Sequence, residues 1–258
     1  METLNQEYFV LKKNMALINR LGFNNSGSEK VRSRIISNSP KGLFGINIGP
    51  NKDTNNRLED YLICFRKFYN LADYLTINIS SPNTENLRNF HNEDELNELL
   101  SLINKEKKIL KTTVPITVKI SPDIQDENIN IISDLLLKHN VEAVIISNTT
   151  DKNRENLSNI NKLEKGGLSG KPLEKRSNEL INKFYKILKN KIKIIGVGGV
   201  DSGHSAYQKI INGASLVQIY TGMIYQGPSI ATKISQELIN ILEKEGIKNI
   251  SDIVGSKN

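Results

Sequence analysis

Small polar side chains end one apolar segment of the chain, INISSPNT at residues 77–84, and their types suit hydrogen bonding to a ligand. In an extended strand Asn78 and Ser80 share one face and Ser81 lies on the other. Pro82 has no N–H to donate to a sheet and favours extended geometry at the residue before it. Alternation alone therefore predicts Ser80 as the partner of Asn78 and places Ser81 at the rim, where alternation becomes unreliable.

A lysine interrupts a second apolar segment, VPITVKISPD, at position 119. A buried ammonium group is costly unless an anion or an electron-rich group lies beside it. Lys119 could lie at an exposed strand edge or face a cofactor. We favour the cofactor because ISPD, directly after it, is another polar strand end.

Two glycine-rich stretches, GGLSGKPL at 166–173 and GVGGVDSG at 196–203, come immediately before helix-like segments. Backbone N–H groups in such loops can hold a phosphate, and a helix N-terminus adds a favourable dipole. The sequence YTG also follows the last apolar segment, and phosphate sites of barrel enzymes are commonly built near the final two strands. These features predict a cofactor that carries a phosphate group.

The elements that must position these groups alternate between strands and helices. Strands are predicted at 44–49, 74–80, 115–121, 143–148, 193–199 and 215–221, and the helices that follow them at about 53–70, 93–110, 126–139, 172–189, 202–211 and 229–245. The strands are nearly continuous apolar runs, as expected when both faces of a parallel sheet are covered. Polar residues gather after the strands, at the end where barrel enzymes carry their active sites.

The fold class is therefore α/β, of the (β/α)8 TIM-barrel type, with about six strand–helix units. A dinucleotide-binding fold would need GxGxxG after the first strand, and GVGGVDSG comes late and lacks that spacing. Residues 1–40 suggest a helix, a loop and a second helix, with a short hairpin at EYFVLK. A closed barrel needs eight units, so the count raises the question of whether this single domain over residues 1–258 is a partial barrel.

Composition excludes several classes of protein. The net charge is +7, but lysines are scattered among acids without interleaved aromatics, so no nucleic-acid partner is expected. The only cysteine, Cys64, lies in an apolar helix-like segment, which favours a core thiol and an intracellular protein. No apolar run is long enough to span a membrane. No metal site is expected.

Taken together, these stretches resemble dihydroorotate dehydrogenase, specifically the membrane-associated, quinone-using class 2. The matching motifs follow the family's order from about residue 8: INRLGFNN (18–25), GINIGPNK (45–52), INISSPNTENLR (77–88), VKISPD (118–123), ISNTT (146–150), GGLSGKPL (166–173), IIGVGGVDSG (194–203) and LVQIYTGMIYQGP (216–228). The resemblance implies a barrel that binds flavin mononucleotide (FMN) and oxidises (S)-dihydroorotate to orotate during pyrimidine synthesis.

The resemblance also implies roles for individual residues. Ser81 matches the base that removes the C5 proton, and a hydroxyl needs a hydrogen-bond relay for that task. Thr84 and Phe23 match positions that shape this relay and shield it from water. The positions that match substrate contacts are Asn19, Arg20, Leu21, Gly22, Phe23, Asn78, Asn83, Asn148 and Thr149. The positions that match FMN contacts are Asn19, Asn47, Asn78, Lys119, Ser147, Gly170, Gly199, Tyr220 and Thr221, with Ser147 standing where the family usually has threonine.

The chain departs from the family at its beginning. The family's first two barrel strands, with a glycine-rich flavin contact and a substrate-binding lysine, have no counterpart here, nor has the helical segment that docks on the membrane and forms the quinone tunnel. We expect a family enzyme that works with dihydroorotate and a quinone at the cytoplasmic or inner membrane surface. The alternatives are a truncated, impaired remnant or split-protein fragment, and a class 1-like enzyme with a soluble acceptor. Ser81 in place of cysteine, together with NRLGF, argues against class 1.

Overall fold

The structure is a computed structural model that describes residues 7–51, 54–84 and 87–258. Lys52 and Asp53 lie outside the described residues, so the end of the GINIGPNK motif and the first residue of the predicted helix at 53–70 cannot be placed. The same holds for Glu85 and Asn86 inside the INISSPNTENLR motif. The remaining parts of these motifs are all described.

A parallel sheet of six strands organises the molecule, in the order β3-β4-β5-β6-β8-β9. The strands are Gly45–Ile48 (β3), Tyr74–Asn78 (β4), Ile116–Ile120 (β5), Ala143–Ile146 (β6), Lys193–Val197 (β8) and Leu216–Gln218 (β9). Each neighbouring pair is parallel, with β3 and β9 at the two edges. The strands and their number agree with the sequence-based prediction.

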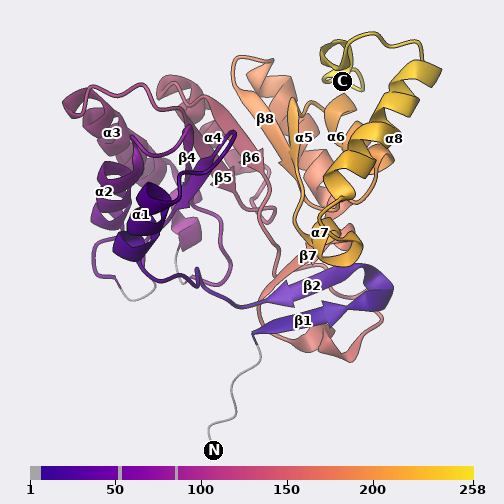
Figure 1. The fold of residues 1–258 in the computed structure, drawn as a ribbon, viewed down its shortest axis with the longest axis horizontal. Coiled ribbons are helices and arrows are strands. Elements are labelled where there is room, and N and C mark those ends of the chain that lie inside the picture. The colour runs from indigo at the N-terminus through magenta and orange to yellow at the C-terminus, as the bar shows by residue number, and fades with distance from the viewer. Residues whose placement is uncertain (1–6, 52–53, 85–86) are drawn as a thin grey trace, which may run out of the picture.

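Helices connect the strands and pack beside one another along the sheet (Figure 1). They are Ser28–Ser37 (α1), Arg57–Phe68 (α2), Glu93–Ile109 (α3), Glu127–Lys138 (α4), Glu174–Leu188 (α5), Gly203–Ile211 (α6), Thr221–Gln226 (α7) and Ile230–Lys244 (α8). Short 3-10 turns occupy Lys12–Asn14, Leu87–His91, Ile160–Leu163, Lys171–Leu173 and Ile250–Ile253. Their contacts run from α2 to α3, α4, α5, α6 and finally α8, so one continuous helical layer covers the sheet.

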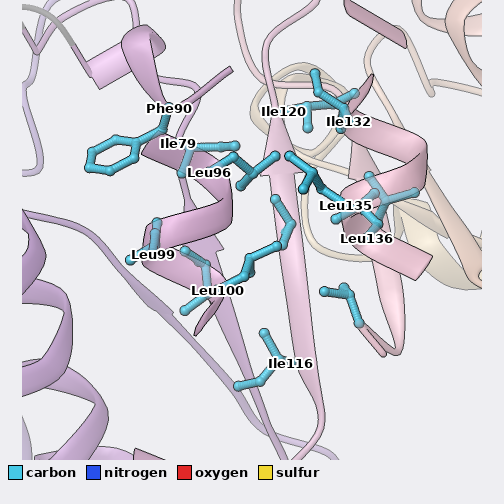
Figure 2. Close-up of a cluster of buried hydrophobic side chains, with 14 of the residues drawn as sticks. Ile79, Phe90, Leu96, Leu99, Leu100, Ile116, Ile120, Ile132, Leu135 and Leu136 are labelled. Carbon is cyan, nitrogen blue, oxygen red and sulfur yellow. The ribbon is translucent and has the colours of Figure 1, made fainter. Parts of the chain in front are cut away.

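Side chains alternate between the two faces of the sheet. One face packs against the helices and forms the main core, in which Ile77, Val118 and Val144 are fully buried. Figure 2 shows part of this core, where Ile116 and Ile120 of β5 lie between residues of α3 and α4. The opposite face is much more polar on β4 and β5, and it is the face from which a ligand can be reached.

A second, antiparallel sheet corrects the prediction for the N-terminal segment. Tyr8–Leu11 (β1) pairs with Ala16–Asn19 (β2), and β2 pairs with Gly167–Gly170 (β7). The helix predicted at the start of NMALINRLGFNNSG is therefore wrong, because Ala16–Asn19 forms β2 and no helix follows it among the described residues before Ser28. The hairpin predicted at EYFVLK is right only for its first strand, since the partner strand β2 lies beyond that stretch, and the second predicted helix is α1. The error arose because one of the two partners of β2, the strand β7, lies about 150 residues later in the sequence, and no local pattern reports such a pairing.

Two further expectations can be compared with the structure. Cys64 lies half-buried on α2, and burial raises the pKa of its thiol, which disfavours the reactive thiolate and agrees with a packing role. Within the described ranges, no helix is both long enough and apolar enough to cross a membrane.

The packing of α3 gives a first testable prediction. Leu96 is fully buried in the main core, and truncating it to alanine removes apolar contacts and leaves a cavity. We expect Leu96→Ala to lower the free energy of unfolding by about 2–5 kcal/mol, measured by urea denaturation. Ile109→Ala, at a 60% exposed position of the same helix, is the matched control and should change stability by about 0.5 kcal/mol or less. Equal effects of both substitutions would contradict this packing.

Candidate functional site

A cavity of about 420 Å³ opens at the carboxyl ends of β5, β6, β8 and β9. Its volume is in the usual range for a small-molecule or cofactor site. Many of the residues predicted to bind ligands line it: Asn19, Lys119, Ser147, Asn148, Thr149, Gly170, Gly199, Tyr220 and Thr221. The structure therefore brings together side chains that are separated by up to two hundred positions in the sequence.

Asn78, Ser80 and Asn148 form a hydrogen-bonded cluster beside this cavity. The Ser80 hydroxyl donates to Asn78 Oδ1 at 2.8 Å and accepts from Asn148 Nδ2 at 2.9 Å. Asn148 Nδ2 also lies 3.4 Å from Asn78 Oδ1. The predicted pairing of Ser80 with Asn78 is confirmed. Because the donor and acceptor of Ser80 are both engaged, its hydroxyl orients the two amides and has little capacity left for a ligand.

Ser81 lies in the loop that follows β4 and differs from Ser80 in its contacts. Its hydroxyl oxygen accepts a hydrogen bond from the backbone N–H of Asn83 at 3.2 Å, so its own hydrogen remains available. Asn83 Nδ2 in turn donates to the carbonyl oxygen of Asn19 at 3.0 Å and to its side-chain oxygen at 3.2 Å. The loop is thereby tied to the end of β2.

Thr84 is buried in the same loop, and its hydroxyl finds no hydrogen-bond partner among the described residues. A buried hydroxyl left unpaired is costly, and such groups in native proteins commonly have a functional reason. Thr84 is three residues after Ser81 and directly follows Asn83, whose N–H donates to the Ser81 hydroxyl. It is therefore a candidate member of a proton relay.

Lys119 projects from β5 on the same face as Asn78, its partner in the strand register. Burial lowers the pKa of its ammonium group, and no neighbouring charge or hydrogen bond in the described part of the chain counters that effect. Lys119 lines the cavity, and none of the described residues forms an ion pair with it. An unpaired cation of this kind suits an electron-rich or anionic ligand, because such a ligand would repay the cost of its burial.

An ionic cluster that sequence reasoning missed holds the Ser81 loop in place. Arg88, seven residues after Ser81, forms ion pairs with Asp123 at 2.9 Å and Asp151 at 3.1 Å. The Thr150 hydroxyl donates to Asp123 at 2.5 Å. Burial raises the pKa of Asp123, and the guanidinium of Arg88 opposes this rise. Since Asp123 follows β5 and Asp151 follows β6, Arg88 connects three strand ends around the cavity.

Glycines form the opposite wall of the cavity at positions where a side chain has no room. Gly170 has φ +97°, and a Cβ there would lie 2.3 Å from the carbonyl oxygen of Met15. Gly199 has φ +75°, and its Cβ would lie 2.5 Å from Glu174 Cβ. Both glycines line the cavity, so this wall consists of backbone without side chains, as in phosphate-binding loops. Thr221, whose hydroxyl donates to Ser169 at 2.9 Å, lies at the same wall.

The predicted site residues outside this cavity have other surroundings. Asn47 is exposed on the edge strand β3. Arg20 forms an ion pair with Glu164 at 2.9 Å, and its guanidinium carbon lies 4.9 Å from the centre of the Phe9 ring.

The segment after Arg20 forms a turn close to the Ser81 loop. Leu21 precedes Gly22 and Phe23, which have φ values of +60° and +65°. A Cβ added at Gly22 would lie 3.9 Å from the carbonyl oxygen of Asn83. The Phe23 ring packs on Gly49, where an added Cβ would lie 3.5 Å from the ring. These contacts place an aromatic ring near the loop without placing it in the cavity.

Sequence reasoning also missed several cavity residues. Met15, Ser169, Lys171, Asp201 and Tyr225 line the site as well. Tyr225 belongs to α7, a short helix that was not predicted, and its hydroxyl donates to the carbonyl oxygen of Ala16 at 2.9 Å. The signal that could have identified it is its position one helical turn after Thr221, which puts both side chains on one face.

Comparisons with known proteins agree with this geometry. The family model described as "Dihydroorotate dehydrogenase" matches residues 5–242. The chain is 47% identical over 225 residues to a dihydroorotate dehydrogenase (quinone) of Nitrosomonas europaea, and the match covers 84% of this chain and 66% of that protein. It is 45% identical over 236 residues to the protein of the same name from Idiomarina loihiensis, with 89% and 70% covered. The chain thus spans about two thirds of the length of these curated relatives.

Solved structures resemble this fold over almost its whole length. A crystal structure of DHODH in complex with ferulenol from Eimeria tenella superposes with a TM-score of 0.91 at 36% identity, covering 99% of this chain and 75% of that one. A ligand-free DHODH structure from the same organism gives a TM-score of 0.94 at 35% identity, with 99% and 78% covered. The six parallel strands are therefore those of a (β/α)8 TIM-barrel family.

Proposed function

The chain belongs to the dihydroorotate dehydrogenase family, and from that premise we propose that it oxidises (S)-dihydroorotate to orotate with FMN as cofactor and a quinone as electron acceptor. The observation that carries this proposal is that Lys119 and Asn148 line one cavity whose far wall contains glycines, while Asn78 lies beside them, paired with Lys119 in the strand register and 3.4 Å from Asn148. The same proposal assigns the chain to the synthesis of pyrimidine nucleotides.

The residues around the cavity fit FMN in two respects. Gly170 and Gly199 provide close backbone approach for its phosphate group, and Thr221 adds a hydroxyl at that wall. Lys119 provides an unpaired cation for the electron-rich part of the isoalloxazine ring. Asn19, Ser147 and Tyr220 line the cavity between these groups, and Asn47 on β3 is a further candidate contact from outside it. When bound, FMN would supply the two-electron acceptor that none of the protein side chains can provide.

Ser81 is our candidate for the base that removes the C5 proton of the substrate. The Ser81 oxygen accepts a hydrogen bond from the Asn83 N–H, and this bond does not occupy the hydroxyl hydrogen of Ser81. The unpaired Thr84 hydroxyl in the same loop can pass the proton onward. The Phe23 ring, packed on Gly49, would help to exclude water from this relay. Arg88 keeps the loop in position through its two carboxylate partners.

Amide groups are suited to the pyrimidine ring because each can both donate and accept hydrogen bonds. Asn19, Asn83, Asn148 and Thr149 are our candidates for this binding, with Asn78 held in orientation by Ser80. The turn over 20–23 would close the substrate side, since it approaches the Asn83 backbone at Gly22. The quinone acceptor is inferred from the relatives' names, and with it a place at the surface of the cytoplasmic or inner membrane.

The direct test is a spectrum and an assay of the purified protein. After incubation with FMN and removal of free flavin, we expect retained flavin absorbance that is bleached anaerobically by dihydroorotate and restored by a soluble quinone. NAD⁺ and fumarate, supplied in parallel, should not restore it. Bound flavin that dihydroorotate never bleaches would refute the proposed reaction, and restoration by NAD⁺ or fumarate alone would refute the quinone.

A further inference from the structure

Lys209 is a fully buried lysine that the proposed reaction does not use. It lies on α6, and its side chain points inward toward α5 and β8. The Lys209 side chain packs closely against β8, because a Cβ added at Gly196 would lie only 2.9 Å from it. Buried lysines are costly, and apolar residues of similar volume pack as well at lower cost, so its presence calls for a physical explanation.

The ammonium group of Lys209 is the start of a hydrogen-bonded chain. It donates to Ser177 Oγ and to Asn178 Oδ1, both at 3.0 Å. The Ser177 hydroxyl donates onward to the carbonyl oxygen of Val197 at 2.7 Å. The carbonyl oxygen of Ile146 lies 3.3 Å from the same hydroxyl, so the single hydrogen of Ser177 favours Val197, the nearer of the two acceptors.

Val197 is where this chain reaches the ligand cavity. Its carbonyl oxygen also accepts from the backbone N–H of Ser147 at 3.1 Å, which ties the ends of β6 and β8 together. Gly198 and Gly199 follow directly, and a Cβ at Gly198 would lie 3.4 Å from Ser177 Cβ. Val197, Gly198, Gly199 and Ser147 all line the cavity. Two consecutive hydrogen bonds therefore connect Lys209 to Val197, the residue directly before the glycine wall.

The positive charge of Lys209, like its hydrogen bonds, favours a phosphate at the glycine wall. Burial lowers its pKa to about 7, the Glu174 carboxylate opposes this, and the Lys171 ammonium adds to it. A phosphate held near Gly199 would favour the ammonium form of a lysine behind the same loop. Its positive charge would in turn stabilise the bound phosphate.

We propose that Lys209 is a positioning residue for the phosphate of the cofactor: through Ser177 it holds the Val197–Gly199 backbone in the conformation that receives a phosphate group. This rests on the proposed function, because FMN is the ligand that brings the phosphate. The hydrogen bonds that start at Lys209 do not extend to the Ser81 loop or to the groups assigned to the isoalloxazine end of the cofactor.

The test compares two flavins that differ only in the phosphate. Dissociation constants for FMN and riboflavin would be measured by flavin fluorescence with wild-type protein and with Lys209→Met. We expect FMN binding to weaken about tenfold, as for a lost hydrogen bond to a charged group, and riboflavin binding to stay within about twofold. Ser177→Ala, which removes the connecting hydroxyl with little change in volume, should reproduce this selective loss. The double variant should lose no more than the larger single effect, because both residues act through one chain.

Lys186→Met is the matched control, because Lys186 is an exposed lysine of α5 and its replacement removes the same charge. It should leave both constants unchanged. Equal weakening of FMN and riboflavin in Lys209→Met and Ser177→Ala, or unchanged FMN binding in either, would overturn the positioning role. A wild-type protein that does not prefer FMN over riboflavin would instead overturn the FMN site of the proposed function. The two failures are therefore distinguishable.

Discussion

Replacing Ser81 with alanine should lower the rate of dihydroorotate oxidation by about 10²–10⁴-fold while FMN stays bound, because proton transfer by a positioned base contributes a factor of that size. Ser81 lies outside the cavity wall that holds the glycines, and its oxygen is fixed by the Asn83 backbone N–H at 3.2 Å. Its removal leaves the cofactor contacts intact. The measurement is anaerobic single-turnover bleaching of the flavin, which isolates the chemical step from the quinone reaction.

Ser81→Cys gives a positive counterpart to this loss. A thiol has an ordinary pKa near 8.5 and reaches its anionic form far more readily than a serine hydroxyl. The cysteine variant should recover part of the rate, and its activity should fall on the acidic side at a lower pH than that of the wild type. A Ser81→Ala protein that bleaches at the wild-type rate would move the base to another residue.

Ser80 is the alternative that the strand alternation raises, and its contacts make a different prediction. Its hydroxyl donates to Asn78 and accepts from Asn148, so it organises amides that are candidates for holding the substrate. Ser80→Ala should therefore raise KM with a smaller effect on kcat, whereas Ser81→Ala should lower kcat. If the two variants exchange these effects, the base is Ser80.

Much of the fold was predictable because its signals are local. Continuous apolar runs identified the strands of the parallel sheet, and helical spacing of apolar residues identified the longer helices between them. Asn78 and Ser80 were paired correctly because period-two alternation holds inside β4 and just beyond it. The lysine in the middle of an apolar strand was recognisable because it breaks that pattern.

Features that depend on distant partners escaped prediction. GLSG was interpreted as a phosphate loop, and Gly170 does line the cavity, but residues 167–170 also form a strand against β2. The Arg88 cluster joins three loops whose proximity follows only from the neighbouring positions of β4, β5 and β6 in the sheet. The burial of Lys209 follows from the packing of α6 on α5, which no local pattern in the sequence reports.

Lys119 leads to the second large prediction, in which activity and stability change in opposite directions. We expect Lys119→Met to slow flavin reduction by dihydroorotate by about 10²–10³-fold, because a preorganised charge at the developing anion is lost. In the flavin-free protein the same substitution should raise the free energy of unfolding by about 0.5–2 kcal/mol, since methionine fills the space of the aliphatic stem without a buried ammonium group. Thermal or urea unfolding of the flavin-free protein measures this gain.

The pH dependence follows from the lowered pKa of Lys119. Between that lowered value and the ordinary value of 10.5, the unfolded chain binds more protons at this site than the folded chain, so this group makes stability rise with pH. Below the folded-state pKa both states are protonated, and the cost of burying the ammonium group is fully present. The gain in Lys119→Met should therefore be largest below the folded-state pKa of Lys119 and shrink as the pH rises from there toward 10.5.

Lys193→Met is the control for Lys119→Met, because Lys193 is an exposed lysine on the parallel strand β8 and loses the same charge. It should change neither stability nor flavin reduction measurably. A Lys119→Met protein that is less stable than wild type at neutral pH would mean that the ammonium group makes a favourable contact in the folded state. Unchanged flavin reduction would show that the cation does not face the cofactor. Slower flavin reduction together with a higher free energy of unfolding is what we expect when a buried charge serves catalysis at the expense of stability.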